Sequence, residues 1–192
     1  MSRTIITPKA RLSYPKLFTP QAPEKPGDKP KWGGAFIFEE GSDLEEMKQA
    51  AMEVATQRHG ADAADLIRAG KIHWPFRTDA KDGYPEGCTW MNINTTQQPG
   101  VIGPNKEPLT ERDVYPGCYV RASIGAYYFD RGTKKGVTFG LNNVQKLADG
   151  ERLDNRKMAE EEFDEVPTDD TPAVPAQESL AQAPKSMKDL GL

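Results

Sequence analysis

The segment from residue 117 to residue 129 constrains the fold more than any other, because its side chains alternate between two kinds. Successive residues of a β-strand point to opposite faces of a sheet. One face is apolar and comprises Cys118, Val120, Ala122, Ile124, Ala126 and Tyr128. The other mixes aromatic rings with a guanidinium and comprises Tyr119, Arg121, Ser123, Gly125, Tyr127 and Phe129. We therefore expect a long strand with one core face and one face that is neither core nor ordinary polar surface.

The fold is predicted to be mainly β with a helical insertion. Four further segments are expected to be extended, at residues 3–18, 32–39, 88–95 and 136–146. Pro15 makes the first of these an edge strand or a bulged strand. The last strand is expected to form a hairpin with the long strand. Its turn contains Gly132 and the basic pair Lys134–Lys135, which predicts a loop longer than the tight two-residue type.

The helical insertion is predicted between residues 42 and 69. Ser42 followed by Glu45 matches a capping box at the start of a helix, and Gly60 matches its C-terminal cap. Apolar side chains recur at helical spacing at Leu44, Met47, Ala51, Val54 and Ala55. A short second helix is expected over residues 61–69. The stretches 19–31, which is basic and rich in proline, and 96–116 are predicted to be loops.

The charge of the chain is divided unequally along its length. Residues 1–148 carry 20 Lys and Arg against 17 Asp and Glu, a net charge of +3, whereas residues 149–192 carry 5 against 12, a net charge of −7. Hydrophobic periodicity also stops near residue 148, and low hydrophobicity with like charges is typical of disorder. We therefore expect one folded domain over residues 1–150 and a disordered acidic tail rich in Pro and Ala over residues 151–192.

Aromatic and basic side chains recur together in several segments, as in surfaces that bind single-stranded nucleic acid. Bases stack on aromatic rings, typically for about 1–3 kcal/mol per base, and Lys and Arg neutralise phosphates. The predicted contact residues are Tyr119, Arg121, Tyr127, Phe129, Trp90, Asn92, Trp32, Lys31, Trp74, Arg77, Tyr14 and Lys16. Each aromatic residue has an alternative role in the core. Trp32, for example, shares a strand face with Phe36 and Phe38.

The sequence argues against an enzyme. Asp79 and Asp82 form a loop carboxylate pair, but nothing brings them together with another acid to hold two cations. The stretch Gly100–Gly103 lacks the Lys-Ser/Thr that follows a phosphate-binding glycine loop. The cysteines and histidines have no zinc-finger spacing. We therefore expect no catalytic residues, no cofactor, no metal and no small-molecule substrate.

The sequence also predicts that the chain does not associate with membranes. No stretch approaches the roughly 20 apolar residues that a membrane span needs. The first residues are too few and too polar for a secretory signal peptide. A cytoplasmic location is the expectation.

Four blocks of sequence carry a resemblance to a known family: Arg11–Phe18, Asp113–Ser123, Gly136–Lys146 and Asp149–Arg152. Together they resemble phage single-stranded DNA-binding proteins, long catalogued as a domain of unknown function and similar in architecture to those of T7-like phages. The resemblance implies an OB-fold, a five-stranded Greek-key barrel. It also implies sequence-independent binding and protection of single-stranded DNA in phage replication, recombination or repair, in the cytoplasm of a bacterial host. One departure is the early helical pair, since the helix of an OB-fold usually follows the third strand.

The tail is predicted to have a function of its own. Its acidic stretch contains Phe163, Asp164 and Glu165, an internal equivalent of the acidic and aromatic ends of many such proteins. We expect it to recruit a phage or host polymerase, helicase or nuclease, or to compete for the DNA groove; solubility alone is the alternative. For the whole chain, the alternative is an OB-fold protein-interaction adaptor of the phage replication machinery that does not bind DNA directly.

Overall fold

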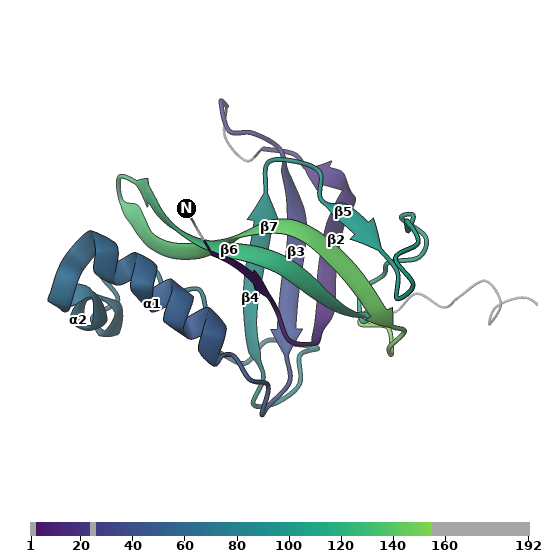
Figure 1. Ribbon diagram of the computed structural model, residues 1–192, viewed down its shortest axis with the longest axis horizontal. Helices are drawn as coiled ribbons and strands as arrows, with labels where there is room; N and C mark the ends of the chain where they lie inside the picture. Colours follow the sequence, from purple (N-terminus) through teal and green to yellow (C-terminus); the bar gives the residue numbers. More distant parts are fainter. Residues whose placement is uncertain (1–2, 24–25, 155–192) are drawn as a thin grey trace, which may run out of the picture. The chain divides into compact units, whose positions relative to one another are not determined.

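The computed structural model describes residues 3–23 and 26–154. Their helices and strands, in chain order (Figure 1), are β1 Thr4–Ile6, β2 Ala10–Gln21, β3 Lys31–Phe38, α1 Glu45–His59, the 3-10 turn η1 Gly60–Asp62, α2 Ala63–Arg68, β4 Thr89–Thr95, β5 Gly100–Ile102, β6 Tyr119–Arg131 and β7 Lys134–Ala148. The predicted tail residues Phe163, Asp164 and Glu165 lie outside the described residues.

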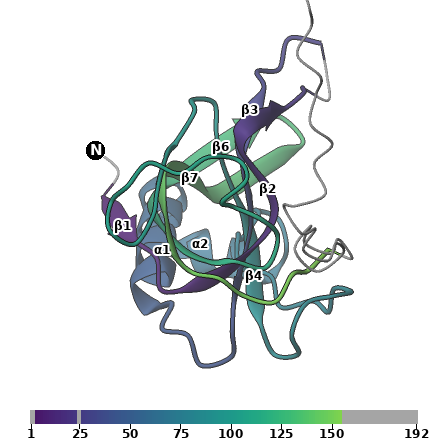
Figure 2. The ribbon, with the colours of Figure 1, turned by 90° about the vertical axis from the view of Figure 1, so that its right-hand side faces the viewer.

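Five strands close into a barrel. β2, β3 and β4 form an antiparallel meander, β2 also pairs with β6, and β6 pairs with β7. The ring is completed by a parallel pairing of β4 with β7 at Asn94 and Gly140, and Figure 2 shows the strands surrounding the core. β1 extends the sheet at β6, and β5 extends it at β7. The order β2–β3–β4–β7–β6 is that of an OB-fold, so the predicted fold is confirmed.

The barrel interior is filled by the apolar face that the alternation predicted. Val120, Ala122, Ile124 and Ala126 of β6 are at most 3% exposed. They pack with other fully buried side chains, which include Phe36, Phe38, Met91, Ile93 and Phe139. Each large apolar side chain buried in this way contributes about 1.5–3 kcal/mol.

β2 contains the bulge that Pro15 predicted. Ser13 pairs with Ala35 and Lys16 with Gly33, so β2 has one residue more than β3 between these pairs. Tyr14, at the bulge, has a φ of 48°. Such a bulge bends a strand and changes the direction of its side chains.

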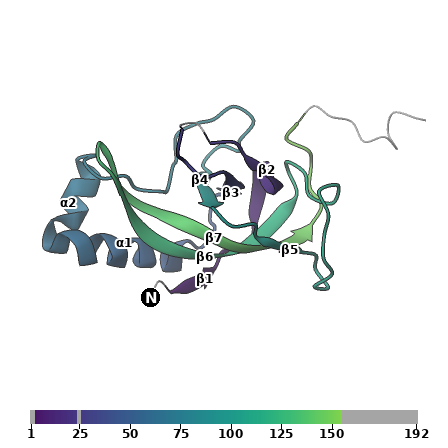
Figure 3. The same cartoon turned by 90° about the horizontal axis from the view of Figure 1, so that it is seen from above.

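The helices follow the second barrel strand, so the early insertion is confirmed. The predicted capping box is wrong, because α1 begins at Glu45. The Ser42 hydroxyl instead donates to the carbonyl of Glu39 at 2.7 Å, and Asp43 accepts the N–H of Glu45. Gly60, with a φ of 60°, ends the helix as predicted. α1 packs along β6 and β7 (Figure 3).

The predicted long hairpin loop is also wrong. Arg131 pairs with Lys134, so the turn between β6 and β7 consists of Gly132 and Thr133 alone. Gly132 supplies the positive φ, 70°, that tight hairpin turns need. Lys134 and Lys135 are consequently strand residues, which extend β7 beyond the barrel. The predicted loop 96–116 contains the short strand β5, which was missed.

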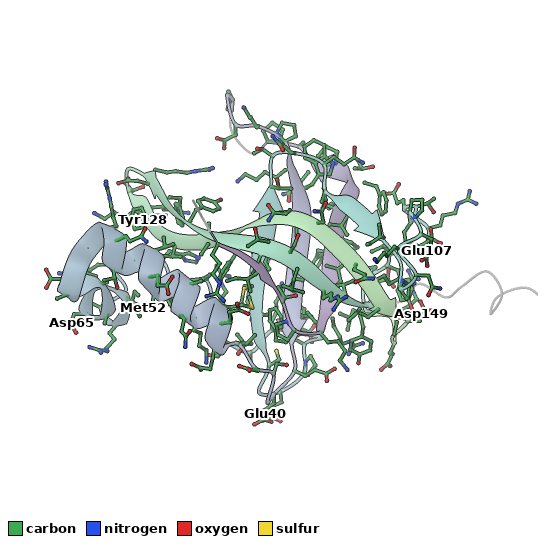
Figure 4. All side chains as sticks on the ribbon, viewed as in Figure 1. Glu40, Met52, Asp65, Glu107, Tyr128 and Asp149 are labelled. Carbon is green, nitrogen blue, oxygen red and sulfur yellow. The ribbon has the colours of Figure 1, made fainter. Side chains whose placement is uncertain are left out.

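Residues from three of the blocks that carry the family resemblance contact one another at the end of the barrel away from the hairpin turn. The ring of Tyr115 lies 5.2 Å from the Lys146 ammonium and 4.8 Å from the Arg152 guanidinium. Its hydroxyl donates to Asp149 and accepts the N–H of Gly150. Hydrogen bonds from Lys146 and Tyr115 hold the pKa of Asp149 below its usual value. Figure 4 shows Asp149 and Tyr128 at opposite ends of the β6–β7 ribbon.

Candidate nucleic-acid interface

The outward face of β3 and β4 carries few large side chains and forms the floor of the candidate site. Lys16, Gly33, Asn94 and Gly140 pair in register across four strands. The neighbouring row is Ser13, Ala35 and Asn92. Because glycine and alanine have little or no side chain, the backbone itself forms much of this surface.

Two hollows lie over this floor, one of about 880 Å3 and one of about 380 Å3. They share four lining residues, Lys31, Asn92, Asn94 and Arg131, and therefore form one trough. We call it the basic groove. One wall is the outer part of the β6–β7 hairpin, and the other is the end of β2 with the loop that leads to β3. In Figure 1 this loop lies at the top and the hairpin turn at the left.

The basic groove concentrates positive charge. Its lining contains eight cationic side chains: Lys16, Lys29, Lys31, Lys71, Arg77, Arg131, Lys134 and Lys135. Asp28 is the one carboxylate that the described residues contribute to the lining. None of the eight cations forms an ion pair within residues 3–23 and 26–154. The groove therefore has a positive charge that the described part of the protein leaves unneutralised, which attracts polyanions.

Aromatic rings stand on both sides of the groove. Large apolar side chains are exposed at three described positions, and two of these, Tyr14 and Tyr127, line the groove at 63% and 46% exposure. The Tyr127 ring lies over Gly140, where a Cβ would be 3.4 Å from Cε1. Burial raises the pKa of the Tyr127 phenol, so the ring is uncharged at neutral pH. Phe129, further along β6, contacts the ring of His73 at a centroid distance of 5.8 Å.

His73 is held in the groove wall by backbone bonds to β7. Its N–H donates to the carbonyl of Lys135 at 2.8 Å, and its carbonyl accepts the N–H of Val137 at 2.9 Å. Partial burial, and then the charge of Arg77, lower the pKa of the imidazole. Both effects favour the neutral imidazole in the free protein.

The structure brings seven of the twelve predicted contact residues together in the groove: Tyr14, Lys16, Lys31, Arg77, Asn92, Tyr127 and Phe129. They come from β2, β3, β4, β6 and the segment before β4, which only the closed barrel places side by side.

The predicted tryptophans do not line the groove. Trp90 points away from the barrel interior, but it is 4% exposed, because Tyr84 and Arg77 cover its ring. Its indole N–H donates to the carbonyl of Asp79. Trp74 is half-buried and packs on Phe76 beside the core.

Trp32 follows Lys31 on β3 and therefore points to the opposite face of the sheet. It is half-buried, and its indole N–H has no hydrogen-bond partner among the described residues. The sequence left open a core role for this residue, and its position on the inner side of β3 agrees with that alternative.

Tyr119 and Arg121 lie towards the other end of β6 from Tyr127, eight and six residues away, which corresponds to roughly 26 and 20 Å along the strand. Tyr119 donates to Glu39 and contacts the Lys9 ammonium at 4.6 Å. Arg121 donates to Gln145. Neither lines the groove, so their predicted contact with DNA remains a prediction.

Six residues that line the basic groove are not among the contact residues predicted from the sequence. They are Lys29, Lys71, Asn94, Arg131, Lys134 and Lys135. Arg131, Lys134 and Lys135 surround Gly132 in the sequence, but the predicted long turn places Lys134 and Lys135 in a loop and not on a strand. The sequence around Lys71 does not indicate that this residue lines the groove, because its position depends on the pairing of His73 with β7.

Between residues 3 and 154, without 24 and 25, no cluster of three or more His, Cys, Asp or Glu could hold a metal ion. No helix in this part of the chain is long and apolar enough to cross a membrane.

A closed five-stranded barrel with a cationic, aromatic-edged trough across β3 and β4 defines an OB-fold protein of the nucleic-acid-binding class. The chain belongs to the family described as "Enterobacter phage Enc34, ssDNA-binding protein", whose model matches residues 3–173. The resemblance noted in the sequence is thereby confirmed. This family is one of binding proteins, not of enzymes.

Individual proteins agree with this assignment. "Putative protein p50" of Acyrthosiphon pisum secondary endosymbiont phage 1 is 30% identical over 166 residues, which cover 81% of this chain and 90% of that protein. The single-stranded DNA-binding protein of bacteriophage Enc34, solved in complex with ssDNA, has a TM-score of 0.64 at 18% identity and covers 79% of this chain and 89% of its own. The gp2.5 single-stranded DNA-binding protein of bacteriophage T7 has a TM-score of 0.57 at 9% identity, with coverages of 81% and 97%. At these identities the two structures establish a shared fold.

Proposed function

We propose that this chain binds and protects single-stranded DNA without sequence preference, in the replication, recombination or repair of phage DNA. The DNA lies in the basic groove. Family membership supports the proposal, as does the Enc34 protein, which has the same fold and was solved with ssDNA.

One observation carries the proposal. The eight groove cations come from separate segments of the chain, yet they converge on one trough and have no carboxylate partner among the described residues. A fold gains no stability from gathering like charges, since they repel each other. Such an arrangement favours a polyanionic ligand, whose binding releases counterions and depends steeply on salt.

The groove chemistry also accounts for tolerance of any sequence. Lysine and arginine contact phosphates, which are the same at every nucleotide. Tyr14 and Tyr127 present ring faces, and every base can stack on such a face. A groove edged by rings accepts unpaired bases but not the stacked interior of a duplex, so we expect preference for the single strand.

The tail is the second part of the proposal. Leu153, close to the end of the described chain, packs on the outer cluster of Ile37, Cys88 and Trp90. Trp90 is two residues from Asn92 on the same face of β4, and Asn92 lines the groove. The described chain therefore ends beside this outer cluster, and the acidic segment follows it in the sequence. We propose that it competes for the groove cations and offers Phe163 and its acidic neighbours to a polymerase, helicase or nuclease.

The test of DNA binding is fluorescence anisotropy of a labelled oligothymidine, titrated at about 50 and 200 mM salt, with a duplex as control. The proposal predicts tight binding to the single strand, weakened strongly by salt, and weaker binding to the duplex. If the folded protein does not bind at low salt, the proposal is wrong and the adaptor alternative gains support.

The tail is tested separately by deleting residues 157–192. Competition predicts that the shortened protein binds oligothymidine more tightly, and most clearly at low salt. Unchanged or weaker binding would contradict competition without affecting the proposal for the groove.

A further inference from the structure

Tyr14 has a backbone conformation that bulky side chains rarely adopt. Its φ of 48° lies in the left-handed region, where a non-glycine residue is uncommon. The conformation arises at the bulge between the pairs Ser13–Ala35 and Lys16–Gly33. Bulges change the direction of side chains next to functional sites. Here the bulge places the Tyr14 ring at the rim of the basic groove, where it is 63% exposed.

Although the Tyr14 ring is exposed, it contacts one charged side chain of the protein. The ammonium of Lys81 lies 4.8 Å from the ring centroid. The same ammonium is 4.7 Å from the ring of Tyr84 and 4.8 Å from that of Trp90, and it donates to the Tyr84 hydroxyl at 3.2 Å. Lys81 therefore lies among three aromatic rings, an arrangement in which each ring attracts the cation electrostatically.

The groups around Lys81 are fixed by the fold. The N–H of Tyr84 donates to the Lys81 carbonyl at 3.0 Å and closes the turn that contains Lys81. Trp90 belongs to the buried cluster with Ile37 and Cys88, and its indole donates to Asp79. Lys81 thus joins the exposed ring of Tyr14 to a buried part of the barrel. Lys81 is not itself among the residues that line the groove.

We propose that Lys81 is a positioning residue that holds Tyr14 as a preformed platform, on whose open face a nucleobase stacks. The cation covers one side of the ring, and the high exposure of Tyr14 leaves the other side free. A ring held in advance loses less freedom when a base stacks on it, so binding is stronger. The inference rests on the proposed function and adds a residue that acts on DNA only through Tyr14.

A double-mutant cycle with oligothymidine separates this role from a direct phosphate contact. Tyr14→Ala should weaken binding about 5- to 100-fold. Lys81→Met, which keeps the length of the side chain but removes the charge, should weaken it about 3- to 10-fold. The double variant should bind as Tyr14→Ala does, within about twofold, because without the ring Lys81 has nothing to position.

Salt dependence gives the second readout. A lysine that contacts phosphate contributes about 0.7 to the slope of log affinity against log salt for a single strand. Lys81→Met should leave this slope at the wild-type value. Lys106→Met, at an exposed lysine outside the groove, is the matched control and should change neither affinity nor slope. If Lys81→Met does not fold, as judged by its urea transition, Lys81→Gln replaces it in the same cycle.

Three results would overturn the inference: independent losses that multiply in the double variant, a slope reduced by about 0.7 in Lys81→Met, or wild-type affinity of that variant. Absence of binding by the wild-type protein would instead refute the proposed function.

Discussion

The backbone of Gly33 lies against the carbonyl oxygen of Ile93 on the neighbouring strand. A Cβ at Gly33 would be 2.2 Å from that oxygen and 2.8 Å from the Cα of Asn94. The φ of Gly33 is 148°, which L side chains rarely adopt. Only glycine lets β3 and β4 approach in this way, and their approach forms the floor of the basic groove.

Gly33→Ala should therefore destabilise the barrel by about 2–3 kcal/mol, since the methyl group adds a backbone clash to an unfavourable φ. Urea unfolding measures the change. Gly41→Ala is the matched control, because Gly41 has a φ of 82° but no atom near its Cβ position. That variant should lose only about 1 kcal/mol. Equal losses in both variants would show that the close approach is not important for stability.

Lys134 and Lys135 are predicted to contact phosphates. Replacing both by Met should weaken oligothymidine binding and lower the salt slope by about 0.7 for each lysine that contacts a phosphate. Lys48→Met serves as the control, because Lys48 lies on α1 and pairs with Glu45. A double variant with an unchanged slope would place the DNA away from the hairpin wall.

Tyr127 is predicted to stack a base. Tyr127→Ala should cost about 1–3 kcal/mol of binding free energy, while Tyr127→Phe, which keeps the ring, should bind nearly as well as wild type. Anisotropy measures both. Equal loss in the two variants would mean that the hydroxyl, not the ring face, makes the contact.

Trp90 and Tyr119 provide the contrast. Trp90→Ala should lower the free energy of unfolding by about 3–5 kcal/mol, because it empties a buried position. Tyr119→Ala should have a much smaller effect on a short oligothymidine than Tyr127→Ala, since Tyr119 lies outside the groove. If Tyr119→Ala lost as much affinity as Tyr127→Ala, the DNA-binding surface would have to continue along β6 beyond the groove.

His73 should make binding depend on pH. Burial, and then the charge of Arg77, lower the pKa of the His73 imidazole in the free protein. Phosphates nearby favour the imidazolium and raise this pKa, so binding takes up protons. Affinity should therefore increase as the pH falls from about 7.5 to 5.5. His73→Gln should remove most of this increase. His59→Gln is the control and should keep it, because His59 is the last residue of α1 and its ring is hydrogen-bonded to Tyr128. A pH dependence that persists in His73→Gln would assign it to another group.

The sequence predicted the barrel better than the groove. The alternation in β6, the bulge at Pro15 and the helix end at Gly60 are local properties, and all three were confirmed. The hairpin turn was misjudged because Lys134 and Lys135 resemble loop residues, although two residues suffice for the turn. β5 was missed because three residues in a stretch rich in glycine and proline give no pattern.

The groove could not be derived locally, because barrel closure brings its residues together. Period-2 alternation in β4 places Trp90 on the same outer face as Asn92, but it contains no information about Tyr84 and Arg77, which cover the Trp90 ring. The alternation also treats the outer face of β6 as one surface, whereas Tyr127 borders the groove and Tyr119 lies at the far end of the strand.

The most direct test of the central claim is photo-crosslinking of the full-length protein to an oligonucleotide that carries 5-iododeoxyuridine, followed by mapping of the crosslinked peptides. The account predicts crosslinks at Tyr14 and Tyr127, on the two sides of the basic groove, and their loss when competing oligothymidine is added. Specific crosslinks confined to the end of β6 around Tyr119 or to α1, with none in the groove, would contradict it.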